Sequence, residues 1–142
     1  MDTFISRSPA DTVAFGVKLG SMARQGWVIG VTGDLGAGKT QLVKGIAESL
    51  GIRERIPSPT FALVIEHRGG RWPLFHLDLY RLETMAQILA AGLEDFLFSG
   101  EGLTVIEWYE RWQGPAPAQL CRVTLRATSE TERLIEYHAP CP

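Results

Sequence analysis

Eight residues, GDLGAGKT at Gly33–Thr40, constrain this chain more than any other stretch. The apolar run Trp27–Val31 precedes them and predicts a strand that is buried on both faces. Behind them, apolar side chains recur at helical spacing: Leu42, Val43, Ile46, Ala47 and Leu50. A strand, a glycine-rich loop and a helix in this order match the G-x-x-x-x-G-K-[ST] pattern of a phosphate-binding loop.

The residue types of this loop suit a polyphosphate. Glycines let successive backbone N–H groups point at one anion, because no Cβ blocks its approach. We expect Lys39 to neutralise the β- and γ-phosphates of ATP and Thr40 to place its hydroxyl on Mg²⁺. An ordinary glycine turn is the alternative, and the full match in context disfavours it. The predicted cofactor-binding residues are Gly33, Asp34, Leu35, Gly36, Ala37, Gly38, Lys39 and Thr40.

Two carboxylates stand where apolar runs end, Asp78 in PLFHLDLYR and Glu107 in LTVIEWYE. An acid at the end of a buried strand near a phosphate loop can hold Mg²⁺ directly or through water. Each could instead be solvated, or paired with a nearby arginine such as Arg81. Together they suggest a division of labour, in which one carboxylate supports the metal and the other holds water. Which of the two touches Mg²⁺ stays open.

Three further side chains lie near these motifs. His76 interrupts the run before Asp78, so we expect its neighbours not to be uniformly buried, and we interpret this lone histidine as structural. Thr60, in Pro57–Phe61, could carry a hydroxyl to Mg²⁺ and the γ-phosphate, although the composition favours a rigid surface turn. We interpret Trp108 as a core or interface residue rather than a cover for the site.

The remaining pattern predicts one α/β domain over residues 1–142, with a parallel core, antiparallel hairpins and flanking helices, as in P-loop NTPases. A short strand at residues 2–6 precedes a helix that Ser8 caps and Gly26 ends, with Val13, Val17, Leu19 and Met22 buried. Hairpins are expected to turn at residues 68–71 and 129–130, and the helical stretch after Glu83 to break near Gly92.

Composition excludes several classes of protein. The formal net charge of −2 gives no basic field, so strong direct binding of tRNA is not expected. The two cysteines, Cys121 and Cys141, do not have metal-type spacing, and we expect them to be reduced. The N-terminal segment has no basic and apolar leader and no apolar run reaches membrane length, so a cytoplasmic protein is expected.

Taken together, the motifs resemble one family. GDLGAGKT, SPTF, HLDLYRL and IEW follow in this order within about 75 positions, and the combination resembles TsaE (YjeE), a small bacterial ATPase of tRNA threonylcarbamoyladenosine (t6A) synthesis. The resemblance extends to DTVAFGVKLG near the start and TERL near the end. It implies an ATPase that needs Mg²⁺, is slow alone and cycles a complex of TsaD and TsaB.

The resemblance also assigns residues. It implies Thr40 and Asp78 as metal ligands, with Glu107 near Mg²⁺, and a switch-like role for Thr60. It places Thr12 and Arg133 near the nucleotide. The implied catalytic set is Glu107, Asp78, Lys39 and Thr60, and the implied metal set is Thr40, Asp78 and Glu107.

Two other functions use the same loop. A small-molecule kinase needs an acceptor pocket and a lid with several arginines, whereas only Arg111 follows Glu107 before the Pro-rich connection. A nucleotide-sensing module needs no hydrolysis, and the presence of both acids argues against it. The sequence does not indicate whether the chain self-associates.

Overall fold

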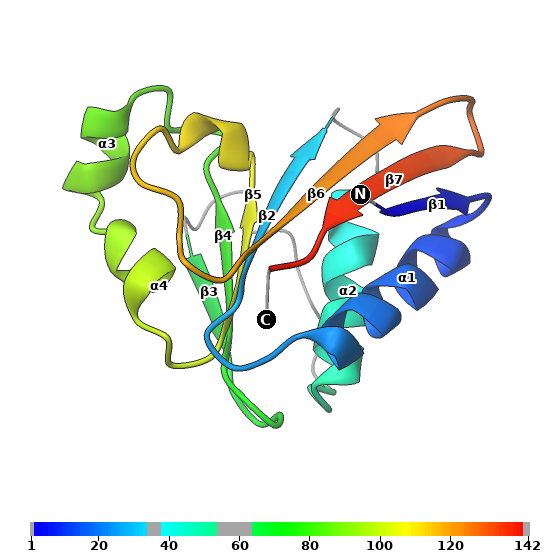
Figure 1. The fold of residues 1–142 in the computed structure, drawn as a ribbon, viewed down its shortest axis with the longest axis horizontal. Helices are drawn as coiled ribbons and strands as arrows, with labels where there is room; N and C mark the ends of the chain where they lie inside the picture. Colours follow the sequence, from blue (N-terminus) through cyan, green and yellow to red (C-terminus); the bar gives the residue numbers. More distant parts are fainter. Residues whose placement is uncertain (1, 34–37, 54–63, 141–142) are drawn as a thin grey trace.

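A computed structural model of the chain describes residues 2–33, 38–53 and 64–140. Within them, seven strands form one sheet in the order β1-β7-β6-β2-β5-β4-β3 (Figure 1). The strands are β1 (Asp2–Ser6), β2 (Val28–Gly33), β3 (Val64–His67), β4 (Leu74–Asp78), β5 (Leu103–Glu107), β6 (Leu120–Ala127) and β7 (Arg133–His138). The helices are α1 (Pro9–Met22), α2 (Lys39–Ser49), α3 (Met85–Ala90), α4 (Glu94–Phe98) and the 3-10 helix η1 (Tyr109–Arg111).

The centre of the sheet is parallel and its margins are antiparallel. Strand β2 lies between β6 and β5 and runs parallel to both, and β4 runs parallel to β5. The pairs β3–β4, β6–β7 and β1–β7 are antiparallel. The predicted α/β class, with a parallel core and antiparallel hairpins, is therefore confirmed. Parallel strands such as these are covered on both faces, which explains why β2 and β5 consist mostly of buried apolar residues.

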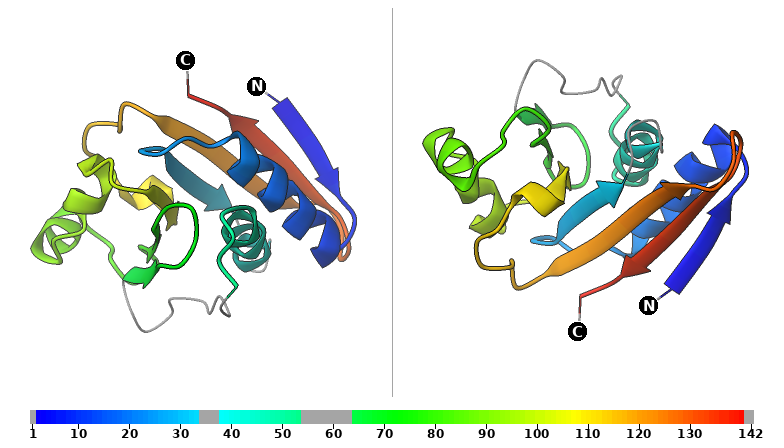
Figure 2. Two further views of the ribbon diagram at one scale, coloured as in Figure 1. Left: turned by 90° about the horizontal axis from the view of Figure 1, so that it is seen from below. Right: turned by 90° about the horizontal axis from the view of Figure 1, so that it is seen from above.

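Helices cover the two faces of the sheet differently. Helices α1 and α2 lie together on one face, and α3 and α4 lie against the other (Figure 2). Alternate residues of β4 and β5 pack against different pairs of helices, because successive side chains of a strand point to opposite faces. Leu74, Leu103 and Val105 pack with the α1–α2 core. Phe75, Leu77 and Ile106 pack with the α3–α4 core. The same alternation assigns His76, Asp78 and Glu107 to the face of α2.

Helix α1 differs from the sequence prediction in its end and in its buried face. Ser8 caps it as expected, accepting a hydrogen bond from the Asp11 N–H. The helix ends at Met22 rather than near Gly26, and Met22 is exposed instead of buried. Val13 and Val17, also expected to be buried, are half-buried, and only Leu19 of the predicted set is buried. Its buried residues are Thr12, Phe15, Gly16, Leu19 and Gly20. The aliphatic spacing misled because α1 packs closely on α2 through a face that contains glycines.

The other local predictions hold in the described residues. The strand that begins near Trp27 runs from Val28 to Gly33. The helical stretch after Glu83 divides into α3 and α4, with Gly92 between them at φ +73°. The C-terminal hairpin joins β6 and β7 through residues 128–132. No helix in the described part of the chain is long and apolar enough to cross a membrane.

Candidate functional site

Two glycines with positive φ angles stand where β2 ends and where α2 begins. Gly33 has φ +137°, and a Cβ there would lie 2.1 Å from the Leu125 carbonyl oxygen of β6. Gly38, the N-cap of α2, has φ +99°. Only glycine adopts these conformations without a penalty, which accounts for the first and last glycines of the motif. Residues 34–37, which carry the middle of the predicted loop, lie outside the described residues.

Lys39 and Thr40 form the first turn of α2. The N–H groups of a first turn have no acceptor within their helix, and they carry the positive end of its dipole. The Lys39 side chain is buried, and its Nζ lies 4.1 Å from the centre of the Trp108 ring. Thr40 is half-buried. The Lys39 cation and the N-terminus of α2 therefore lie at the same end of the sheet.

The two predicted acids end adjacent parallel strands. Asp78 and Glu107 are register partners at the ends of β4 and β5, and Glu107 is also in register with Val31 of β2. The strand order places Glu107 directly beside the strand that enters the glycine-rich loop, and Asp78 one strand further away. The structure thus brings both acids to the end of the sheet at which β2 enters that loop.

Glu107 is held by a residue whose contact the sequence did not reveal. His76 Nε2 lies 2.5 Å from Glu107 Oε2, with His76 fully buried and Glu107 5% exposed. The expectation of uneven burial around His76 is wrong, because Leu74–Leu77 are all buried. The sequence did hold a signal that His76 lies on the face of the acids. Residues i and i+2 of a strand share a face, and His76 stands two positions before Asp78.

Asp78 is held within its own chain segment. Its Oδ1 accepts a hydrogen bond of 2.9 Å from the Tyr80 N–H. Burial raises the pKa of the Asp78 carboxyl above its usual value, and the nearby Glu107 carboxylate adds to the rise. The Tyr80 N–H, His76 and Lys39 act in the opposite direction. The two carboxylates and the lysine are therefore close enough to influence one another electrostatically.

Trp108 links the acidic strand end to the lysine. It has φ 60° and ψ 39°, the one positive φ at a non-glycine residue among those described. Such backbone conformations are costly and concentrate at functional sites. Its ring contacts the Lys39 ammonium, the Arg111 guanidinium 5.2 Å away and the Tyr80 ring. Trp108 is therefore part of the site's wall as well as of the apolar packing below it.

Thr12 and Arg133 lie at the same end of the sheet as the glycine-rich loop. A Cβ on Gly38 would lie 3.6 Å from Thr12 Cγ2, and Thr12 Oγ1 shares a hydrogen bond with Ser6 Oγ. Arg133 pairs with Ser6 and with Ala127, which is two residues beyond the Leu125 that pairs with Gly33.

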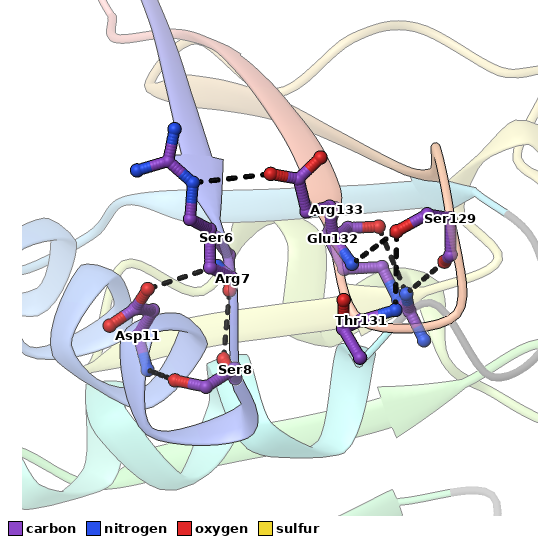
Figure 3. A network of polar contacts seen from close by, with 8 residues as sticks. All are labelled: Ser6, Arg7, Ser8, Asp11, Ser129, Thr131, Glu132 and Arg133. Carbon is purple, nitrogen blue, oxygen red and sulfur yellow. Dashed lines mark hydrogen bonds and ion pairs between the residues drawn. The ribbon is translucent and has the colours of Figure 1, made fainter.

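A polar network lies between the start of α1 and the turn that joins β6 to β7 (Figure 3). Arg7 bridges to Glu132 at 3.1 Å, and its N–H donates to Asp11. Arg133 Nη1 donates to backbone carbonyls of the turn between β6 and β7. The Arg7–Glu132 ion pair joins the segment before α1 to that turn. Thr60 lies outside the described residues, so its predicted position is not tested.

Comparisons with known proteins place this chain among close relatives. A family model described as threonylcarbamoyl adenosine biosynthesis protein TsaE matches residues 6–135. The chain is 36% identical over 132 residues to the TsaE protein of Bacillus subtilis, covering 93% of this chain and 82% of the relative. It is 39% identical over 131 residues to the TsaE protein of Treponema pallidum, covering 92% and 96%.

A solved structure agrees with these sequence relatives. The crystal structure of Bacillus subtilis YdiB superposes with a TM-score of 0.82 at 29% identity, covering 99% of this chain and 86% of the other. The two proteins share the mixed sheet with a parallel core and flanking helices, the P-loop NTPase-like architecture expected from the glycine-rich loop.

Proposed function

Because the chain belongs to the TsaE family, we propose that it binds and hydrolyses ATP as an accessory protein for t6A modification of tRNA. Residues 1–142 would act as a single P-loop ATPase domain, and the family model covers most of them. The observation that carries the proposal is the corner where buried Lys39 opens α2 opposite Asp78 and Glu107. A cation and a helix N-terminus facing two acids suit a triphosphate bound with a divalent metal.

The phosphates would bind to the loop at Gly33–Thr40, including Asp34, Leu35, Gly36 and Ala37. The left-handed Gly38 and the first turn of α2 supply backbone N–H donors. Lys39 would leave the Trp108 ring to meet the β- and γ-phosphates. Thr12 beside Gly38, and Arg133 at the same edge, would contact the rest of the nucleotide.

The donor set fits Mg²⁺. Thr40, Asp78 and Glu107 offer the hard oxygen atoms that Mg²⁺ prefers. Among the described residues, no three His, Cys, Asp or Glu side chains are arranged as a metal cage. A nucleotide-bound Mg²⁺ needs no such cage, because it uses one or two carboxylates together with phosphates and waters. When bound, Mg²⁺ would neutralise charge on the phosphate oxygens.

The two acids would divide the remaining work. Asp78 would support the metal, since its short side chain is fixed by the Tyr80 N–H. Glu107 would orient the attacking water and accept its proton, because its longer side chain ends the strand adjacent to β2. We assign Thr60 a hydroxyl contact to Mg²⁺ and the γ-phosphate. The catalytic set is then Glu107, Asp78, Lys39 and Thr60.

The proposed partners are proteins of the TsaB and TsaD type, with tRNA involved only through them. The formal charge of −2 offers no basic field for direct tRNA binding. ATP hydrolysis would cycle the partner complex between turnovers. We expect a slow rate for the chain alone, since an arginine supplied by a partner commonly accelerates such reactions.

Phosphate release from Mg·ATP tests this function. The chain is assayed alone, with TsaB- and TsaD-type partners, and with an added alcohol or nucleoside. We expect partners to raise the rate and the small acceptors to leave it unchanged. Acceptor-dependent turnover would identify a kinase instead, and binding without turnover in all conditions would identify a nucleotide sensor.

A further inference from the structure

His76 is the one fully buried residue of β4 whose side chain is polar. Its strand neighbours in register are Ile65 of β3 and Val105 of β5, both apolar. Within the described residues, His76 Nδ1 is buried without a hydrogen-bond partner. Burying an imidazole with one nitrogen unsatisfied costs stability, and an apolar side chain at this position would avoid that cost.

The other ring nitrogen has a specific partner. His76 Nε2 lies 2.5 Å from Glu107 Oε2, across the parallel pair of β4 and β5. A carboxylate accepts hydrogen bonds and cannot donate them, so the imidazole N–H is the donor. A hydrogen bond to an ionised acceptor is stronger than one between neutral groups. The contact with Glu107 is therefore what the polar ring contributes at this position.

This contact compensates for the length of the Glu107 side chain. Glutamate has more rotatable bonds than aspartate, so it loses more conformational entropy when it is fixed for a reaction. Asp78 is fixed by a backbone N–H two residues away, whereas Glu107 depends on a side chain from the neighbouring strand. His76 binds Oε2, so Oε1 keeps both of its lone pairs for a water molecule or a metal.

We propose that His76 is a positioning residue that holds the Glu107 carboxylate for its role in ATP hydrolysis. The inference rests on the proposed function and extends it, because it assigns a task to a histidine that touches neither phosphate nor metal. Asp78 lies beside the pair as the register partner of Glu107, and Lys39 on α2 is close enough to act on the Asp78 carboxyl. The proposed task requires only the hydrogen bond and its direction.

Substitutions at His76 separate positioning from packing. His76→Phe removes the donor and keeps a ring, whereas His76→Gln offers an amide N–H in place of Nε2. The matched control is His67→Phe, because His67 is also buried but pairs with Leu74, at the opposite end of the β3–β4 hairpin. Turnover of ATP with partners, the Kd of Mg·ATP and the unfolding temperature are measured for each.

We expect His76→Phe to bind Mg·ATP within about threefold of the unchanged chain and to lose about tenfold or more in turnover. His76→Gln should recover most of that loss, and His67→Phe should show none of it. In a Glu107→Gln background, His76→Phe should cause no further loss, because the two residues act as one unit. Near-normal turnover in His76→Phe, or an equal further loss in that background, would overturn the inference.

A nucleotide-free measurement keeps the test decisive if His76→Phe does not fold. The His76 Nε2–H resonance is compared by NMR between the unchanged chain and Glu107→Gln. We expect it to move to lower frequency in the variant, because a charge-assisted bond becomes a neutral one. An unchanged resonance would overturn the contact and the inference. Absence of turnover in the unchanged chain with partners would instead overturn the proposed function.

Discussion

The carboxyl ends of β4 and β5 carry the two acids of the candidate site, but the fold holds them in different ways. Asp78 is half-buried and accepts a hydrogen bond from the Tyr80 N–H of its own segment. Glu107 is 5% exposed and is bound by His76 from the neighbouring strand. The two residues are nevertheless register partners, so a single pair of strands presents both.

The difference teaches that proximity in a sheet does not make two acids equivalent. A local backbone bond survives changes elsewhere in the fold, whereas a bond between strands depends on register and on the partner's identity. We therefore expect Asp78 to be robust and replaceable in structural terms, and Glu107 to be sensitive to the residues around it. Trp108, directly after Glu107, has a strained backbone. The end of β5 is therefore more constrained than the end of β4.

The largest effect is expected from removing the charge of Glu107. Glu107→Gln keeps an oxygen that can accept from His76, so the fold should be preserved. Turnover with partners should fall by about 100-fold or more, as for loss of a general base, while the Kd of Mg·ATP changes little. Phosphate release and calorimetry on the same preparations check this. Normal turnover would remove Glu107 from the catalytic role.

The corresponding change at Asp78 should act on the metal. Asp78→Asn keeps an oxygen for the Tyr80 N–H and removes the charge next to Mg²⁺. We expect ATP affinity to weaken by about tenfold in the presence of Mg²⁺ and to be unchanged without it. Titrations with and without Mg²⁺ measure the difference. If Asp78→Asn instead matched Glu107→Gln, the division of labour between the two acids would be wrong.

Stability offers an independent contrast. His76→Leu leaves the buried Glu107 carboxylate without its partner, so we expect a loss of about 2 kcal/mol in the free energy of unfolding. The double variant His76→Leu/Glu107→Leu should regain part of that loss. Asp78→Ala removes one local hydrogen bond and should cost about 1 kcal/mol or less. Urea denaturation of the unchanged chain and the three variants measures these values. Equal losses in His76→Leu and Asp78→Ala would show that the fold does not hold the two acids differently.

A similarly small effect is expected where Arg111 joins the ends of β4 and β5. Arg111 Nη1 donates to the carbonyls of Tyr80 and Leu82, which joins η1 after β5 to the segment after β4. Arg111→Met keeps most of the packing on Trp108 and removes these bonds, at an expected cost of about 1 kcal/mol. Arg111→Lys is the control that keeps the charge. No change in unfolding free energy would show that the two ends are held independently.

Much of the site was predictable from local pattern. The glycine-rich loop, the start of α2 at Lys39 and the acids at the ends of apolar runs all followed from residues adjacent in sequence. The order of the strands did not, because nothing in the chain shows that β5 inserts between β2 and β4. The contact of His76 with Glu107 depends on that order and on register, which explains why His76 was interpreted as structural.

Other features depended on packing that composition does not encode. The buried face of α1 includes Gly16 and Gly20, which a search for aliphatic periodicity overlooks. The left-handed backbone at Trp108 had no sequence signal, since glycine or asparagine is the usual residue there. Thr12 was assigned to the site only through the family resemblance, and in the structure it lies beside Gly38.

Calorimetric titration of the folded chain with Mg·ATP tests most directly whether the loop and the two acids form a triphosphate site. The account predicts a saturable heat for one nucleotide per chain. It also predicts that Lys39→Met keeps the unfolding temperature of the unchanged chain but shows no measurable binding. Absence of any heat from the folded, unchanged chain, with and without TsaB- and TsaD-type partners, would contradict it.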